Sequence, residues 1–144
     1  MKQEEILQQV KDGRLSVEEA STLLKGIEDI GYAAIDLSRQ KRNGFPEIIY
    51  GEGKNIEQLI GIITAMNEHK TAILATRVNA EKGEALSQAF PEGVYEPLGR
   101  TFVLNPIAPK HEHYIAVVTA GTSDIPVAEE AAVTAETFGN HVKR

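Results

Sequence analysis

Cysteine is absent from this chain of 144 residues. Its absence excludes disulfide bonds, thiolate metal sites and a cysteine nucleophile within these residues. No apolar run approaches the roughly 18 residues of a membrane-spanning helix, and residues 1–5 carry too much charge for a signal peptide. We therefore expect a cytoplasmic protein that makes no contact with a membrane.

A surplus of positive charge is also lacking, because the formal net charge is -6. This acidity argues against general nucleic-acid binding, which depends on clustered lysine and arginine, and leaves a local basic patch open. Hydrophobic residues make up 42% and charged residues 25%, as in folded soluble domains. A chain of this length can bury roughly two thirds of its unfolded surface, which is enough for a core.

Residues 1–27 are predicted to form a helical hairpin. Apolar residues recur at helical spacing up to Val10, and the sequence Asp-Gly-Arg then interrupts the pattern. Ser16 and Glu19 stand at the spacing of a capping box, in which each side chain accepts a hydrogen bond from the other residue's backbone. We expect a small packing element, and a docking arm for another subunit is the alternative.

Residues 28–110 are predicted to form a small α/β domain that contains a charged loop, residues 36–54. The expected elements are a short strand at 48–50, a helix capped by Asn55, a buried strand at 71–78, a helix from Asn79 and a strand at 101–104. Two prolines, at 106 and 109, favour an extended connector, so we place a domain boundary at residue 110.

Residues 111–144 are predicted to form one βα unit. The apolar run at 114–120 predicts a buried parallel strand, and a helix with Pro126 in its first turn follows. A buried parallel strand needs neighbours on both sides, so this unit either completes the sheet of residues 48–104 or opens a separate domain. The fold class predicted for the whole chain is α/β.

The strongest candidate site is the turn between this strand and its helix. Gly121 permits a tight turn, and the N–H groups of Thr122, Ser123 and Asp124 are expected to point out of the helix start. Unpaired donors at the positive end of a helix favour a phosphate or carboxylate group. The alternative is that Ser123 or Asp124 simply caps the helix.

The charged loop is the second candidate, because it holds the cations Arg39, Lys41, Arg42 and Lys54. Arginine suits bidentate recognition of phosphate or carboxylate, whereas an ordinary solvated segment is the alternative. His111 and His113 would share one face of an extended segment. Two histidines without an acidic partner cluster make a poor zinc site, so we predict no metal site.

Together these stretches resemble the LarB family. The resemblance rests on D-L-S-R-Q-K-R-N-G-F-P-E from Asp36, I-I-Y-G-E-G-K from Ile48, A-T-R-V from Ala75, and T-A-G-T-S-D-I-P-V-A-E-E-A from Thr119. It covers essentially the whole chain. The family is related to the aminoimidazole ribonucleotide (AIR) carboxylases and helps to build the nickel-pincer cofactor of lactate racemase.

The resemblance implies a pyridinium-3,5-biscarboxylic acid mononucleotide synthase. Such an enzyme carboxylates the pyridine ring of nicotinic acid adenine dinucleotide, with CO₂ or bicarbonate as co-substrate, and hydrolyses the phosphoanhydride to release AMP. Gly121, Thr122, Ser123 and Asp124 would hold the substrate, and Arg39, Arg42 and Lys54 would add contacts to phosphate or carboxylate. No firmly bound cofactor is implied, Mg²⁺ stays open, and the full-length protein would be a homo-oligomer.

One departure from the family matters. The family continues into a complete flavodoxin-like domain and supplies a cysteine that forms an adduct with the pyridine ring, and that residue lies beyond this chain. We therefore expect a truncated protein, consisting of the N-terminal α/β domain and the first βα unit of the catalytic domain, that is inactive alone. The alternatives are a non-catalytic nucleotide-binding or oligomerisation module and a purely structural domain.

Overall fold

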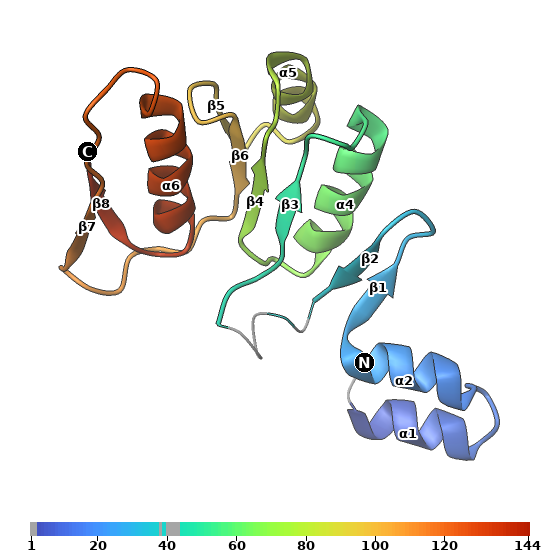
Figure 1. Cartoon of the computed structure of the whole chain (residues 1–144). Helices are drawn as coiled ribbons and strands as arrows, with labels where there is room; N and C mark the ends of the chain where they lie inside the picture. Colours follow the sequence, from blue (N-terminus) through green and yellow to red (C-terminus); the bar gives the residue numbers. More distant parts are fainter. Residues whose placement is uncertain (1–2, 38, 40–43) are drawn as a thin grey trace. The chain divides into compact units, whose positions relative to one another are not determined.

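The computed structural model describes residues 3–37, 39 and 44–144, which form a mixed α/β structure (Figure 1). Its helices are α1 (Gln3–Lys11), α2 (Val17–Lys25), α4 (Ile56–Glu68), α5 (Ala80–Ala89) and α6 (Ile125–Thr137). Its strands are β1 (Ile27–Asp29), β2 (Ala34–Asp36), β3 (Ile48–Tyr50), β4 (Ile73–Thr76), β5 (Val94–Glu96), β6 (Thr101–Leu104), β7 (Tyr114–Ala116) and β8 (His141–Lys143).

Contacts divide the chain into two compact units, Met1–Glu47 and Ile48–Arg144. The sequence predicted a different division, into residues 1–27, 28–110 and 111–144. That division concerns which parts fold independently, and it stays a prediction.

The unit Met1–Glu47 begins with the predicted helical hairpin, in which α1 and α2 pack together. The predicted capping box is present: the Glu19 N–H donates to Ser16 Oγ over 3.0 Å, and the Ser16 N–H donates to the Glu19 carboxylate over 2.8 Å. Helix α2 ends at Gly26, whose φ of 68° is the left-handed conformation that glycine adopts without strain. Local hydrogen bonding therefore sets both ends of α2.

Strands β1 and β2 form an antiparallel hairpin that the sequence analysis missed. The Ile30 N–H donates to the Ala33 carbonyl over 3.0 Å and closes the turn between them. At Asp36, the last residue of β2, the N–H donates to the Glu47 carboxylate over 2.9 Å. The first part of the predicted charged loop is therefore the end of a strand rather than irregular backbone.

The unit Ile48–Arg144 is built on a mixed sheet with the strand order β3-β4-β6-β5. Strands β3 and β4 are parallel and are joined by α4, whereas β6 runs antiparallel to both β4 and β5. Strand β4 is buried along its whole length, as its continuous apolar sequence predicted. Strand β6 covers the residues predicted for it, and β5 was missed.

Helices cover both faces of this sheet. A Cβ at Gly83 of α5 would lie 2.6 Å from the Tyr95 ring, so α5 packs on the face that carries Tyr95. Val94 and Val103 point to the opposite face, because neighbouring strand residues alternate, and there they line a cavity with Val133 of α6. The face of β4 and β6 opposite α5 therefore lies against α6.

The core is formed largely by α4, β4 and β6. Leu59, Ile63 and Met66 are buried as the predicted apolar stripe of α4 requires, but Ile56 and Ile60 remain half-buried. Burying one such side chain contributes about 1.5–3 kcal/mol. Asn55 and Asn79 cap α4 and α5 as predicted: each side chain accepts a hydrogen bond from the backbone N–H three residues later. These caps fix where both helices leave the sheet.

The predicted buried strand at 114–120 is wrong in length and in burial. Strand β7 stops at Ala116, its residues are exposed, and Val118 is 87% exposed. Within the described residues, β7 pairs with β8 alone, in parallel, across α6. Among the described residues, the other edge of β7 has no neighbouring strand, so its backbone groups there face solvent. This unit therefore does not join the sheet of β3, β4, β6 and β5.

No helix in the described part of the chain is both long enough and apolar enough to cross a membrane.

Candidate functional site

The predicted anion site lies at the turn between β7 and α6, and residues 121–124 are all exposed there. The Asp124 N–H donates to the Gly121 carbonyl over 3.2 Å, so one of the three predicted amide donors is already used. The Asp124 side chain makes no capping hydrogen bond. The amides and hydroxyls of Thr122 and Ser123 remain as the donors that the sequence proposed.

Two of the three predicted cations belong to different compact units. Arg39 is exposed and belongs to the unit Met1–Glu47, whereas Lys54 is half-buried and belongs to the unit Ile48–Arg144. The Lys54 N–H donates to the Gly51 carbonyl over 3.3 Å within the turn after β3. Arg42 lies outside the described residues. The role predicted for these side chains stays a prediction.

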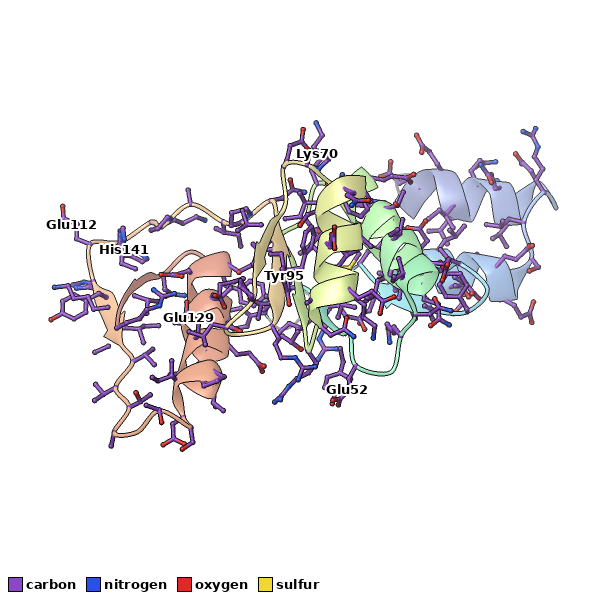
Figure 2. All side chains as sticks on the ribbon, turned by 90° about the horizontal axis from the view of Figure 1, so that it is seen from above. Glu52, Lys70, Tyr95, Glu112, Glu129 and His141 are labelled. Atoms are coloured by element: carbon purple, nitrogen blue, oxygen red, sulfur yellow. The ribbon has the colours of Figure 1, made fainter. Side chains whose placement is uncertain are left out.

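A different group of side chains gathers at the edge of the sheet where β3 and β4 end. We call it the edge cluster; its members are Tyr50, Glu52, Arg77, Lys82 and Arg100. Tyr50 and Glu52 lie within the predicted charged loop, residues 36–54, and Arg77 within the run from Ala75, but the sequence analysis gave none of the five a binding role. In Figure 2, Glu52 projects from this edge, and Lys70 lies at the opposite end of the sheet.

The two strands come very close at this edge. The Gly51 N–H donates to the Thr76 carbonyl over 2.8 Å, and a Cβ at Gly51 would lie 2.8 Å from that same oxygen. Any side chain at this position would displace the backbone, so the glycine is required by space rather than by φ. The close approach holds the turn that carries Glu52 beside the end of β4.

The Tyr50 hydroxyl donates a hydrogen bond to the Glu52 carboxylate. This bond lowers the pKa of Glu52, and the nearby positive charges of Arg100, Arg77 and Lys82 lower it further. The same bond raises the pKa of Tyr50, because it stabilises the protonated phenol beside an anion. The pair therefore stays a neutral phenol and a carboxylate near neutral pH.

The three cations of the edge cluster are held differently. The Lys82 ammonium donates to the carbonyls of Gly51 and Glu52 over 2.8 and 3.2 Å. Arg77 Nε lies 3.3 Å from a Glu130 carboxylate oxygen of α6. For the half-buried Arg100, the described residues provide neither a hydrogen bond nor an ion pair to its guanidinium. Its charge acts on Glu52 through space.

A cavity of about 730 Å³ lies on the other side of this unit, between the sheet and α6 with β8. Apolar residues line most of it: Val94, Val103, Pro106, Ile107, Ala108, Pro109, Val133 and Val142. At its rim, Arg144 binds the carboxylates of Glu129 and Glu136 over 2.7–2.9 Å. This bonding lowers the pKa of Glu136 and raises the pKa of Arg144. The cavity has the size of a small-molecule site, but the guanidinium of Arg144 at its rim is already bound by two carboxylates.

Residues 27–106 match the LarB/PurE-like N-terminal domain. The chain belongs to the LarB family. The resemblance predicted from the sequence is thereby confirmed, and with it a relation to carboxylase-type enzymes.

An uncharacterized protein of Methanocaldococcus jannaschii is similar to this LarB-family chain, with 33% identity over 152 residues. The alignment covers 94% of this chain and 57% of that protein. This chain therefore spans little more than half the length of that relative.

The matched LarB domain includes the edge cluster and excludes the turn at residues 121–124. The match therefore leaves the predicted substrate contacts of Gly121, Thr122, Ser123 and Asp124 untested. Among the residues that the structure describes, no group of three or more histidine, aspartate or glutamate side chains is arranged to hold a metal ion.

Proposed function

We propose that this chain is the N-terminal portion of a carboxylase that acts on nicotinic acid adenine dinucleotide in nickel-pincer cofactor biosynthesis. The observation that carries the proposal is membership of the LarB family through residues 27–106. In the proposed reaction, a ring carbon forms a bond to the carbon of CO₂ and the ring loses a proton. Water then cleaves the phosphoanhydride and AMP leaves.

The parallel pair β7 and β8, joined by α6, supports a place for residues 111–144 in this enzyme. A strand, a helix and a parallel neighbouring strand form the repeating unit of flavodoxin-like domains. We take this as the first unit of the catalytic domain. The cysteine of the family would belong to later strands, so we expect no carboxylase activity from these 144 residues alone. Formation of carboxylated product from this chain, bicarbonate and the dinucleotide would contradict that expectation.

In the proposed enzyme, residues 121–124 hold the substrate's phosphate or carboxylate. Support comes from the exposure of these residues and from the N-terminus of α6, whose 13 residues place a positive dipole end there. Arg39, Arg42 and Lys54 would add positive charge, and CO₂ or bicarbonate would enter as co-substrate. The carboxylation requires a site that keeps water away from the ring.

The substrate site is tested by titrating the chain with nicotinic acid adenine dinucleotide and, separately, with AMP. We expect saturable binding at the turn, seen as shifts of the backbone amides of residues 122–124, that Ser123→Ala and Asp124→Ala abolish. Ser21→Ala and Asp12→Ala, which change the same residue types in the unit Met1–Glu47, should leave the affinity unchanged. Saturable binding without shifts of the amides of residues 122–124 would place the substrate elsewhere.

An oligomerisation module is the second candidate function. The exposed apolar residues Ile115 and Val118, on and just after a strand with an open edge, favour it. Sedimentation at several concentrations distinguishes the two functions. Association that Val118→Asp prevents, without any ligand-dependent rise of the melting temperature, supports the module.

A further inference from the structure

We propose that the edge cluster is an oxyanion-binding site in which Arg77 and Arg100 bind a phosphate or carboxylate group of a small molecule. The site is inferred from the geometry of the unit Ile48–Arg144, whereas the choice of AMP and nicotinate as probes rests on the proposed function. It also concerns a different place in the fold from the turn at residues 121–124.

The location of the cluster is the first argument. Parallel strands β3 and β4 pair Tyr50 with Thr76, so Gly51 and Arg77 both follow at the same edge. Strand β6 runs antiparallel to β4, so Arg100, just before β6, lies at this edge too. Open α/β sheets bind their ligands at the carboxyl ends of parallel strands. The two arginines therefore stand where this architecture binds small molecules.

The backbone at the two arginines is the second argument. The Val78 N–H donates to the Arg100 carbonyl over 2.8 Å, which brings the two positions side by side. Arg77 and Arg100 have φ values of 56° and 54°, in the left-handed region that bulky residues rarely adopt. Asparagine and glycine tolerate this conformation. The turns themselves therefore do not require arginine. Two like charges side by side are destabilising, so a structural role does not explain the pair.

The unused donors are the third argument. Lys82 is occupied by backbone carbonyls, and the Glu52 carboxylate already accepts from Tyr50. The single ion pair of Arg77 in the described residues is made through Nε, so its terminal nitrogens are available. The Arg100 guanidinium has no such contact in the described ranges. A guanidinium donates in a fork that matches the oxygens of phosphate and carboxylate.

Tyr50 defines the class of ligand more narrowly. Tyr50 is 55% exposed, its hydroxyl is bonded to Glu52, and the charges of both arginines act on it, so an accessible ring lies close to them. A flat ring can stack on such a tyrosine. The ligand expected here carries a ring close to its anionic group, as nucleoside monophosphates and aromatic carboxylates both do.

The test is an NMR titration of the ¹⁵N-labelled chain, at constant ionic strength, with inorganic phosphate, AMP and nicotinate in separate arms. We expect saturable shifts of the amides around Glu52, Val78 and Arg100. Tighter binding of AMP would identify phosphate as the anionic group, and tighter binding of nicotinate would identify carboxylate. Either compound should bind more tightly than inorganic phosphate because of its ring. Arg77→Gln and Arg100→Gln should each weaken binding about tenfold or more, as the loss of a charge-assisted hydrogen bond implies.

A second pair of variants separates binding from folding. Arg77→Gly and Arg100→Gly place glycine at the left-handed positions, so they should raise the melting temperature or leave it unchanged while abolishing binding. Arg14→Gln removes an exposed arginine of the other unit and should leave binding unchanged.

The outcomes distinguish this site from the proposed substrate site. Ser123→Ala should have no effect on the shifts around Glu52, Val78 and Arg100. The proposal is overturned if none of the three compounds gives saturable shifts, if the glycine variants bind normally, or if Ser123→Ala abolishes the shifts.

Discussion

At the scale of single residues, Gly51 is the position where β3 approaches β4 most closely. Gly51→Ala would bring a Cβ to 2.8 Å from the Thr76 carbonyl oxygen, and that oxygen is part of the strand backbone. We expect the substitution to lower the free energy of unfolding by about 1–3 kcal/mol, as overpacked sites do. Urea denaturation measures the change.

Gly53 provides the matched control for this prediction. It lies in the same turn, has an ordinary φ, and a Cβ added to it would have no heavy atom within 4 Å. Gly53→Ala should therefore leave the stability almost unchanged. Equal losses of stability in the two variants would mean that space at Gly51 is not the cause.

The bond between Tyr50 and Glu52 makes a prediction about ionisation. Glu52→Gln removes the carboxylate that stabilises the protonated phenol, so the pKa of Tyr50 should fall toward its ordinary value of 10.0. Phenolate absorbance should then appear at lower pH in the variant than in the parent chain. Glu81→Gln changes an exposed glutamate of α5 and should give the parent's titration curve. Identical curves for all three proteins would show that the bond does not form in solution.

Sequence analysis named Arg39, Arg42 and Lys54 and overlooked Arg77 and Arg100. The first three lie within one short stretch of the sequence, so their clustering is visible in the sequence itself. The other two meet because β4 and β6 are adjacent in the sheet, and no local pattern in the sequence determines that order. One local signal existed: Tyr50 and Glu52 stand two residues apart, the spacing at which strand-like side chains share a side.

At the scale of elements, the attachment of β8 to α6 depends on Arg144. The pKa of Glu136 is lowered in the folded chain by its hydrogen bond to Arg144. Its carboxylate therefore supports the fold above its ordinary pKa of 4.5, and this support is lost as the pH falls through the lowered folded value. The hydrogen-exchange protection factors of the amides of residues 141–143 should fall over that acid range.

Arg144→Gln gives the control for this acid effect. Without the guanidinium, the protection factors at β8 should already be low at neutral pH, and they should change less as the pH falls. A parent-like pH profile in this variant would assign the acid effect to another group.

The elements that the sequence predicted well are those with a strong local signal. The caps at Ser16, Asn55 and Asn79 located helix starts, and the continuous apolar run at Ile73 located β4. Strands β1, β2 and β5 are three residues long, too short for an alternating pattern. Strand β7 was predicted too long because its composition is that of a buried strand, whereas burial depends on neighbours that a local reading does not identify.

At the scale of the whole molecule, the division into compact units makes a prediction about folding. A chain that begins just before Ile48 should unfold cooperatively, because β3, β4, β6 and α4 supply its own core. A chain that ends at residue 110 should be less stable, since α6 is packed on the sheet. This truncation removes the fully buried Ala132 and the 2.9 Å hydrogen bond from the Ile107 N–H to the Thr137 carbonyl.

Thermal unfolding followed by circular dichroism tests both truncated chains. It also tests the boundary that the sequence placed at residue 110. Full stability of the chain ending there would support that boundary and would contradict the importance of α6 for the sheet.

Left-handed residues bound the central pair of strands at both ends. Lys70 and Arg77 flank β4, and Arg100 and Asn105 flank β6, all with φ between 52° and 56°. Sliding either strand by one position would force a β-branched residue such as Thr76 or Thr101 into a conformation it avoids. The alignment of these strands is thus fixed by backbone handedness as well as by hydrophobic faces, and one-residue slippage, the usual failure of short sheets, is blocked twice.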